Sequence, residues 1–160
     1  MKELYDKFLE YFDVEEIVSD ELMTQHGAKG NYFILSHFDP RLLEVMVWIR
    51  ESLNKPITIN NWKWGGPFSQ RGLRDNVQTL VQNNTKRNRV YLSGHVLGLA
   101  FDFDVEGMTA IEVREWLVAN ASLCPHPIRL ERNLKGKPIS WVHLDVKNDP
   151  KNSKVYLFDV

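Results

Sequence analysis

The stretch SGHVLGLAFDFDV, residues 93–105, decides the fold. From residue 99 onward its side chains alternate with a period of two, which predicts a β-strand. One face carries Leu99, Phe101, Phe103 and Val105. The other face carries Ala100, Asp102 and Asp104. An otherwise apolar strand therefore presents two carboxylates on a single face.

A second stretch, SWVHLDV at residues 140–146, has the same pattern. It places Trp141, His143 and Asp145 on one face and apolar side chains on the other. Carboxylates and an imidazole on a sheet face that is otherwise apolar need partners, because burying them unpaired is costly. A metal ion bound between the two strands satisfies both sets of groups.

The turn before the first strand supplies one more ligand. Gly94 and Gly98 allow the backbone to bend tightly around His95. Together with Asp102 and His143, this histidine gives a site of three protein ligands with an open fourth position. Two histidines and one carboxylate in this arrangement are typical of catalytic zinc, which acidifies bound water toward neutrality.

Two motifs carry a family resemblance. The first reads Ser-x-His-x-x-Gly-x-Ala-x-Asp over residues 93–102, and the second reads Trp-x-His-x-Asp over residues 141–145. Together they resemble the zinc D-alanyl-D-alanine carboxypeptidase family, which shares its fold with the hedgehog signalling domain and with several phage endolysins. The likeness is closest to the phage and prophage branch and covers residues 57–146.

The resemblance implies a zinc peptidase that cuts amide bonds in peptidoglycan stem peptides, as a D,D-carboxypeptidase or as an endolysin-like endopeptidase. It implies zinc bound by His95, Asp102 and His143. The opening residues 1–16 are acidic and amphipathic and lack the apolar run of a secretory signal. We therefore expect synthesis in the cytoplasm and action at the cell wall after release through lysis or a holin-type pore, which fits a phage origin.

The catalytic base departs from the family pattern. Many members place a glutamate three residues before the second histidine, where this chain has Ser140. If the following hairpin turns near residues 135–136, Glu131 lies across from about Ser140 or Trp141. Glu131 is then the first candidate for the general base. Asp145 is the second candidate, with orientation of a metal ligand as its alternative role.

Other residues are candidates for binding the substrate. Arg71 and Arg74 precede the first motif, and a guanidinium suits a substrate carboxylate or an oxyanion. We favour Arg71 for the catalytic role and place Arg74 among the substrate-binding residues. Trp64 and Trp141 are candidates for lining a groove, although packing is equally compatible with Trp64. Ser93 is expected to hold the bend and border the substrate site.

Composition sets the class of protein. The chain has 160 residues, 43% of them hydrophobic, and a formal net charge of −1. The charge and the absence of a basic stripe argue against a nucleic-acid binder, and no run approaches the ~20 apolar residues of a membrane span. The single cysteine, Cys124, excludes a disulfide scaffold and is expected to be a small buried residue. We expect a monomer acting on a peptidoglycan peptide.

The remaining pattern predicts an α+β fold with a small, mainly antiparallel sheet and flanking helices, hedgehog-like according to the resemblance. We expect a single domain over residues 1–160, with a helical part at 1–55 and a catalytic core at 56–160. Helices are predicted near residues 4–12, 40–53, 72–82 and 108–117, the last with a Thr109–Glu112 capping box and an apolar face that includes Ile111. Strands are predicted at 57–60, 90–92, 99–105, 128–131, 140–146 and 155–158.

One alternative function stays open at this point. Ser140 in the place of the family glutamate is compatible with a non-catalytic zinc-binding module of phage origin, with a structural or recognition role. The complete ligand set and the available Glu131 favour the enzyme.

Overall fold

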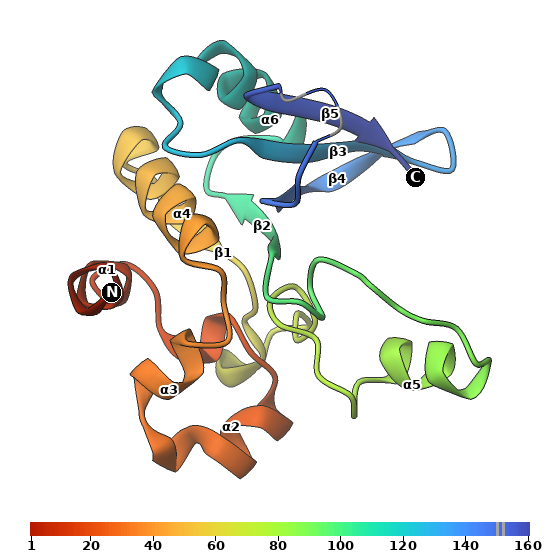
Figure 1. Cartoon of the computed structure of the whole chain (residues 1–160). Coiled ribbons are helices and arrows are strands. Elements are labelled where there is room, and N and C mark those ends of the chain that lie inside the picture. Colours follow the sequence, from red (N-terminus) through yellow and green to blue (C-terminus); the bar gives the residue numbers. More distant parts are fainter. Residues whose placement is uncertain (150, 152) are drawn as a thin grey trace.

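The computed structural model describes residues 1–149, 151 and 153–160. These residues form an α+β fold in which helices flank a five-stranded sheet (Figure 1). The strand order is β1-β2-β4-β3-β5. The strands are β1 (Ile57–Thr58), β2 (Ala100–Val105), β3 (Ile128–Leu134), β4 (Lys137–Asp145) and β5 (Val155–Asp159). The predicted α+β class is confirmed.

The sheet is mixed. The pairs β1–β2, β2–β4 and β3–β4 are antiparallel, whereas β5 pairs with β3 in parallel. The strand predicted at residues 155–158 therefore closes the sheet as expected, but it runs alongside β3 in the same direction. A tight hairpin cannot join parallel neighbours, and here β4 lies between β3 and β5 in the sequence.

The N-terminal part is helical. Its helices are α1 (Lys2–Leu9), α2 (Asp20–His26), α3 (Asn31–Leu35) and α4 (Pro40–Leu53). The start predicted for α4 is confirmed, because the Asp39 carboxylate accepts a hydrogen bond from the backbone N–H of Arg41 at 2.9 Å and Pro40 is the first helical residue. The N-terminal part also contains the 3₁₀ turns η1 (Val14–Glu16) and η2 (Gly27–Lys29), and two more such turns, η3 (Trp62–Trp64) and η4 (Ala121–Leu123), follow in the described part of the chain.

Helix α6 (Ala110–Ala119) packs against β4 and β2, on one face of the sheet (Figure 1). Its predicted capping box is present, since Thr109 and Glu112 bond reciprocally to each other's backbone N–H groups. The prediction that Ile111 belongs to the buried face is wrong, because its side chain is 52% exposed. Val113 and Leu117, four residues apart, form the buried stripe instead.

Two predicted elements between β1 and β2 are wrong. The helix predicted at residues 72–82 is replaced by α5 (Thr79–Lys86). The N–H groups of Leu73 and Arg74 bond to distant carbonyls, of Ile17 and His95, so this segment cannot close helical turns. No strand forms at residues 90–92, where Val90 and Leu92 are exposed and have no sheet neighbour to cover them.

Strand β1 is also shorter than predicted, because the N–H of Asn60 bonds to the carbonyl of Glu16 rather than to a strand.

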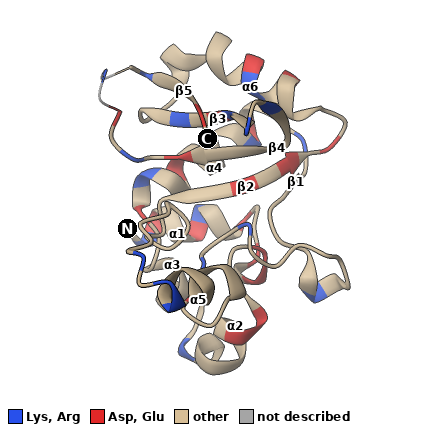
Figure 2. Ribbon diagram, turned by 90° about the vertical axis from the view of Figure 1, so that its right-hand side faces the viewer, with Lys and Arg blue, Asp and Glu red and all other residues tan. Residues whose placement is uncertain are grey.

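One apolar core joins the helical part and the sheet. Its largest fully buried side chains come from both parts of the chain: Phe8, Phe12, Ile34, Leu42, Met46, Ile49, Ile59, Phe101 and Phe103 among them. Cys124 is buried, as expected. In the described part of the chain, charges of both signs are interspersed along the ribbon (Figure 2). No helix among the described residues has the length and apolar character that crossing a bilayer requires.

Candidate metal and catalytic site

The sheet register aligns three ionisable side chains in one row. Asp102 on β2 is paired with His143 on β4, and His143 is paired with Glu131 on β3. Directly opposed residues of antiparallel strands share a face. That face lies opposite the one that carries Phe101 and Leu144 into the core. The row therefore occupies the side of the sheet away from the core.

His95 joins this row from the turn before β2. Its Nδ1 lies 2.9 Å from the backbone carbonyl oxygen of Gly72. Because a carbonyl oxygen only accepts, Nδ1 carries the proton and Nε2 keeps its lone pair toward the other ligands. The bend itself depends on Gly98, which has φ +67°, and a Cβ there would lie 2.0 Å from the carbonyl oxygen of His37.

The three side chains meet at distances that suit a small metal ion. His95 Nε2 lies 3.3 Å from His143 Nδ1 and 3.3 Å from Asp102 Oδ2, and His143 Nδ1 lies 2.6 Å from Asp102 Oδ1. Ligands held at ~2.0–2.1 Å around tetrahedral zinc are about 3.3 Å apart. The two separations from His95 match that spacing, and the third, shorter one is a hydrogen bond between His143 and Asp102. The buried His95–Asp102–His143 group can thus hold a metal ion.

Asp145 orients His143 from behind. Its Oδ2 lies 3.5 Å from His143 Nε2, and its carboxylate receives two hydrogen bonds from Arg129, at 2.7 and 2.9 Å. The backbone N–H of Lys147 donates to the same carboxylate at 3.0 Å. Asp145 is only 2% exposed. With both oxygens engaged, it fits orientation of the ligand better than proton transfer.

Charge in the cluster is set by these contacts. Burial alone would raise the pKa of Asp102, but above all the hydrogen bond from His143 holds it below its usual range. Burial alone would lower the pKa of His143, but hydrogen bonds to Asp102 and Asp145 raise it to about 9. Burial lowers the pKa of His95. Without metal, His143 therefore carries a proton, and a metal ion competes with protons for its nitrogens.

Glu131 lies beside the cluster. It faces His143 across the β3–β4 pair and is partly buried. Burial raises the pKa of its carboxyl group, while the nearby His143 partly offsets this effect. The expected position opposite Ser140 or Trp141 is wrong, because the strand register shifts between Glu131 and Asn133.

A cavity of about 580 Å³ opens over this row. Besides the metal-binding group, it is lined by both base candidates and by three of the predicted substrate-binding residues. Of the predicted site residues, the cavity brings together Arg74, Ser93, His95, Asp102, Glu131, Trp141, His143 and Asp145. Ser93 also holds the bend, since its Oγ accepts a hydrogen bond from the N–H of His95 at 3.3 Å.

The two arginines have different positions. Arg74 lines the cavity and donates to Asp102 Oδ2 at 3.2 Å. Arg71 lines an adjoining cavity of about 550 Å³, stacks on Phe68 at 3.4 Å from the ring centre and pairs with Asp104. Arg74, Asp102 and Trp141 border both cavities, so the two spaces lie side by side.

Trp64 lies apart from the site. It belongs to η3, is 58% exposed, and lines neither of the two cavities. Its neighbour Trp62 packs inward and donates through Nε1 to the carbonyl of Val18 at 2.9 Å.

Sequence reasoning missed two groups that support the ligands. Arg129 holds Asp145, and the carbonyl of Gly72 fixes the tautomer of His95. Arg129 could have been found, since it precedes Glu131 by two residues and so shares its face of the strand. The carbonyl of Gly72 carries no sequence signal, because any residue offers one.

Comparisons of the chain with protein-family models, with curated proteins and with solved structures find no match. The residues and their geometry are thus the basis for any functional conclusion.

Proposed function

We propose that the chain is a zinc-dependent peptidase that hydrolyses amide bonds in peptidoglycan stem peptides. The observation that carries the proposal is the row Asp102–His143–Glu131, joined by His95, at the floor of an open cavity. Three protein ligands with an open position suit metal-assisted hydrolysis, and an adjacent carboxylate can serve as its general base. The class of substrate comes from the resemblance of the two sequence motifs.

The chain supplies the ligands as His95 Nε2, the Asp102 carboxylate and His143. Bound zinc supplies an acidified water molecule and polarises the scissile carbonyl group. Asp145 and the carbonyl of Gly72 keep the two imidazole rings in place.

Glu131 takes the proton of the attacking water and passes it to the leaving amine. The raised pKa of its carboxyl group suits both steps, because it brings the group closer to the working pH. The sequence favours Arg71 for the catalytic role, but we assign the stabilisation of negative charge on the carbonyl oxygen to Arg74, because Arg74 lies beside Asp102. Arg71 is placed to bind a substrate carboxylate in the adjoining cavity.

The test combines elemental analysis with digestion of purified peptidoglycan. We expect about one zinc per chain, lost in His143→Ala, and release of new amino groups by the zinc-loaded protein. Glu131→Gln is expected to keep its zinc and lose at least about a hundredfold in rate. Glu115→Gln, an exposed carboxylate on α6, is the matched control and should retain full activity.

Metal-free protein that takes up no added zinc would overturn the proposal. Zinc binding without release of amine would instead favour the non-catalytic zinc module, which Ser140 at the family glutamate position also permits. A peptidase of this kind acts at the cell wall, so an accompanying prediction is that it reaches its substrate after release from the producing cell.

A further inference from the structure

The β3–β4 hairpin changes register between its turn and the site. Next to the two-residue turn, Leu134 pairs with Lys137 and Asn133 pairs with Pro138. Continued regularly, this register would pair Glu131 with Ser140. Glu131 instead pairs with His143, three residues further along β4.

That shift decides which side chains share a face. Side chains alternate along a strand, so a shift by an odd number of residues moves the partner strand's other face into register. In the regular register Ser140 would lie beside Glu131, and His143 would point to the opposite face. The irregular segment of β4, residues 139–142, is therefore what brings the base candidate to the metal ligand.

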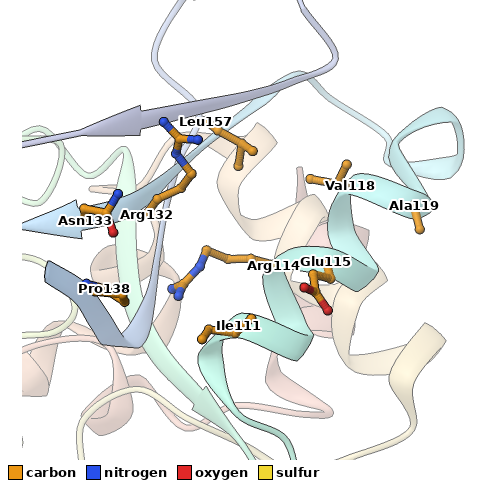
Figure 3. A pocket seen from close by; sticks show the side chains of 9 residues that line it. All are labelled: Ile111, Arg114, Glu115, Val118, Ala119, Arg132, Asn133, Pro138 and Leu157. Carbon is orange, nitrogen blue, oxygen red and sulfur yellow. The ribbon is translucent and has the colours of Figure 1, made fainter. Parts of the chain in front are cut away.

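Arg114 of α6 holds this segment. Its Nη1 donates to the carbonyl of Trp141 at 3.0 Å and its Nη2 to the carbonyl of Ile139 at 3.3 Å. Figure 3 shows Arg114 projecting from α6 toward the strands, in a cavity of about 470 Å³ that Pro138 also borders. The Arg114 side chain is one of the few buried charges, at 7% exposure.

The partners of Arg114 indicate its role. Among the described residues, no carboxylate lies within ion-pair distance of its guanidinium. Its hydrogen bonds go instead to the backbone carbonyls of Ile139 and Trp141, two residues of β4 that have no paired residue on β2 or β3. A buried charge is retained only where its hydrogen bonds compensate for lost hydration. Here the compensation depends on the irregular form of β4.

We propose that Arg114 is a positioning residue: its guanidinium fork fixes β4 in the shifted register and thereby sets Glu131 beside His143. A planar fork with two parallel donors spans carbonyls that lie two residues apart, whereas a lysine ammonium offers a single point of attachment. The catalytic part of this proposal rests on the peptidase function proposed above. The register part is independent of it.

Arg114→Lys and Arg114→Gln test the catalytic part, with Glu115→Gln as the control on the same helix. We expect Arg114→Lys to lower kcat at least about tenfold, with KM and zinc content nearly unchanged. In a Glu131→Gln background the same change should lower the rate by less than about twofold, because Arg114 acts through Glu131. A general loss of structure would lower the rate equally in both backgrounds, and that result would overturn the proposal.

Nuclear magnetic resonance tests the register without any activity. We expect cross-strand proton contacts between residues 131 and 143 in the unmodified protein and their loss or weakening in Arg114→Lys and Arg114→Gln. Contacts that persist in both folded variants would overturn the proposal. If either variant fails to fold, the other carries the test. Contacts in an unmodified protein that cuts no peptidoglycan would reject the peptidase function and leave the register assignment standing.

Discussion

Asp145→Asn separates two roles for Asp145, because a base and an orienting carboxylate respond differently to loss of charge. If Asp145 orients His143, the variant should bind zinc more weakly and regain most of its rate when zinc is saturating. If Asp145 is the base, zinc affinity should hold while the rate falls at least about a hundredfold. The occupied oxygens of Asp145 predict the first outcome.

The size of the effect follows from the geometry. Loss of a group that orients a ligand typically lowers metal affinity by about 10- to 100-fold. His143 Nε2 and Asp145 Oδ2 are 3.5 Å apart, which is longer than the ~2.7–3.2 Å of a strong hydrogen bond. The contact is therefore weak, and we expect the lower end of the range. A tenfold loss corresponds to about 1.4 kcal/mol of binding free energy.

Competition with a chelating dye measures this affinity directly. Asp104→Asn is the matched control, because Asp104 is also an arginine-paired carboxylate on the same sheet but pairs with Arg71 and not with a ligand. Its zinc affinity should stay within about twofold of the unmodified protein. Equal affinity in Asp145→Asn and the unmodified protein would refute the orienting role. Rate loss that saturating zinc fails to restore would move the base from Glu131 to Asp145.

Three further predictions concern stability. Zinc at a hundredfold excess over its Kd should raise the free energy of unfolding by about 2.7 kcal/mol in a thermal or urea titration, and His143→Ala should remove the gain. The free energy of unfolding of the chelated protein should fall by up to about 3 kcal/mol as pH rises from 6.5 through 9, because the folded-state pKa of His143 is raised to about 9. A constant free energy of unfolding over this window would contradict the pairing of His143 with Asp102. Gly98→Ala should lower the free energy of unfolding by about 2–4 kcal/mol and Gly107→Ala by only about 1–2 kcal/mol. Both glycines have positive φ, but a Cβ at Gly98 would lie 2.0 Å from a backbone oxygen, whereas a Cβ at Gly107 would lie 3.4 Å from a lysine amine. Similar losses for both glycines would show that the close approach to His37 is not what fixes the bend.

The sequence predicted elements whose signal is local. The alternation that ends at Val105 gave β2, and Asp39 with Pro40 gave the start of α4. The predictions of elements were wrong where hydrogen bonds to residues distant in the sequence determine the backbone conformation. The backbone N–H groups of Leu73 and Arg74 donate to the carbonyls of Ile17 and His95, so the segment does not form the predicted helix. No periodicity within the segment carries that information.

The same distinction between local and distant determinants applies to the residues of the candidate site. The three candidate metal ligands were predicted because each lies on a regular strand or beside glycines that mark a bend, and the structure brings one ligand atom of each within 4.8 Å of the others. The position of Glu131 was predicted from the turn alone, and the shift between the turn and the site made that position wrong. Register counted from a turn holds only while the hairpin stays regular.

Under the proposed function, the irregular strand has a physical connection with the departure of the sequence from the pattern of the family that its motifs resemble. With Ser140 where a glutamate usually stands, β4 has no carboxylate three residues before His143. A carboxylate from β3 can replace it only if its side chain shares the face of His143, and the regular hairpin forbids that by parity. The three-residue shift removes the obstacle but leaves Ile139 and Trp141 without paired residues, and the buried Arg114 binds the carbonyls of both. A chain that kept Ser140 and Glu131 but lost the arginine at position 114 would thus retain its candidate metal ligands while losing the placement of its proposed base.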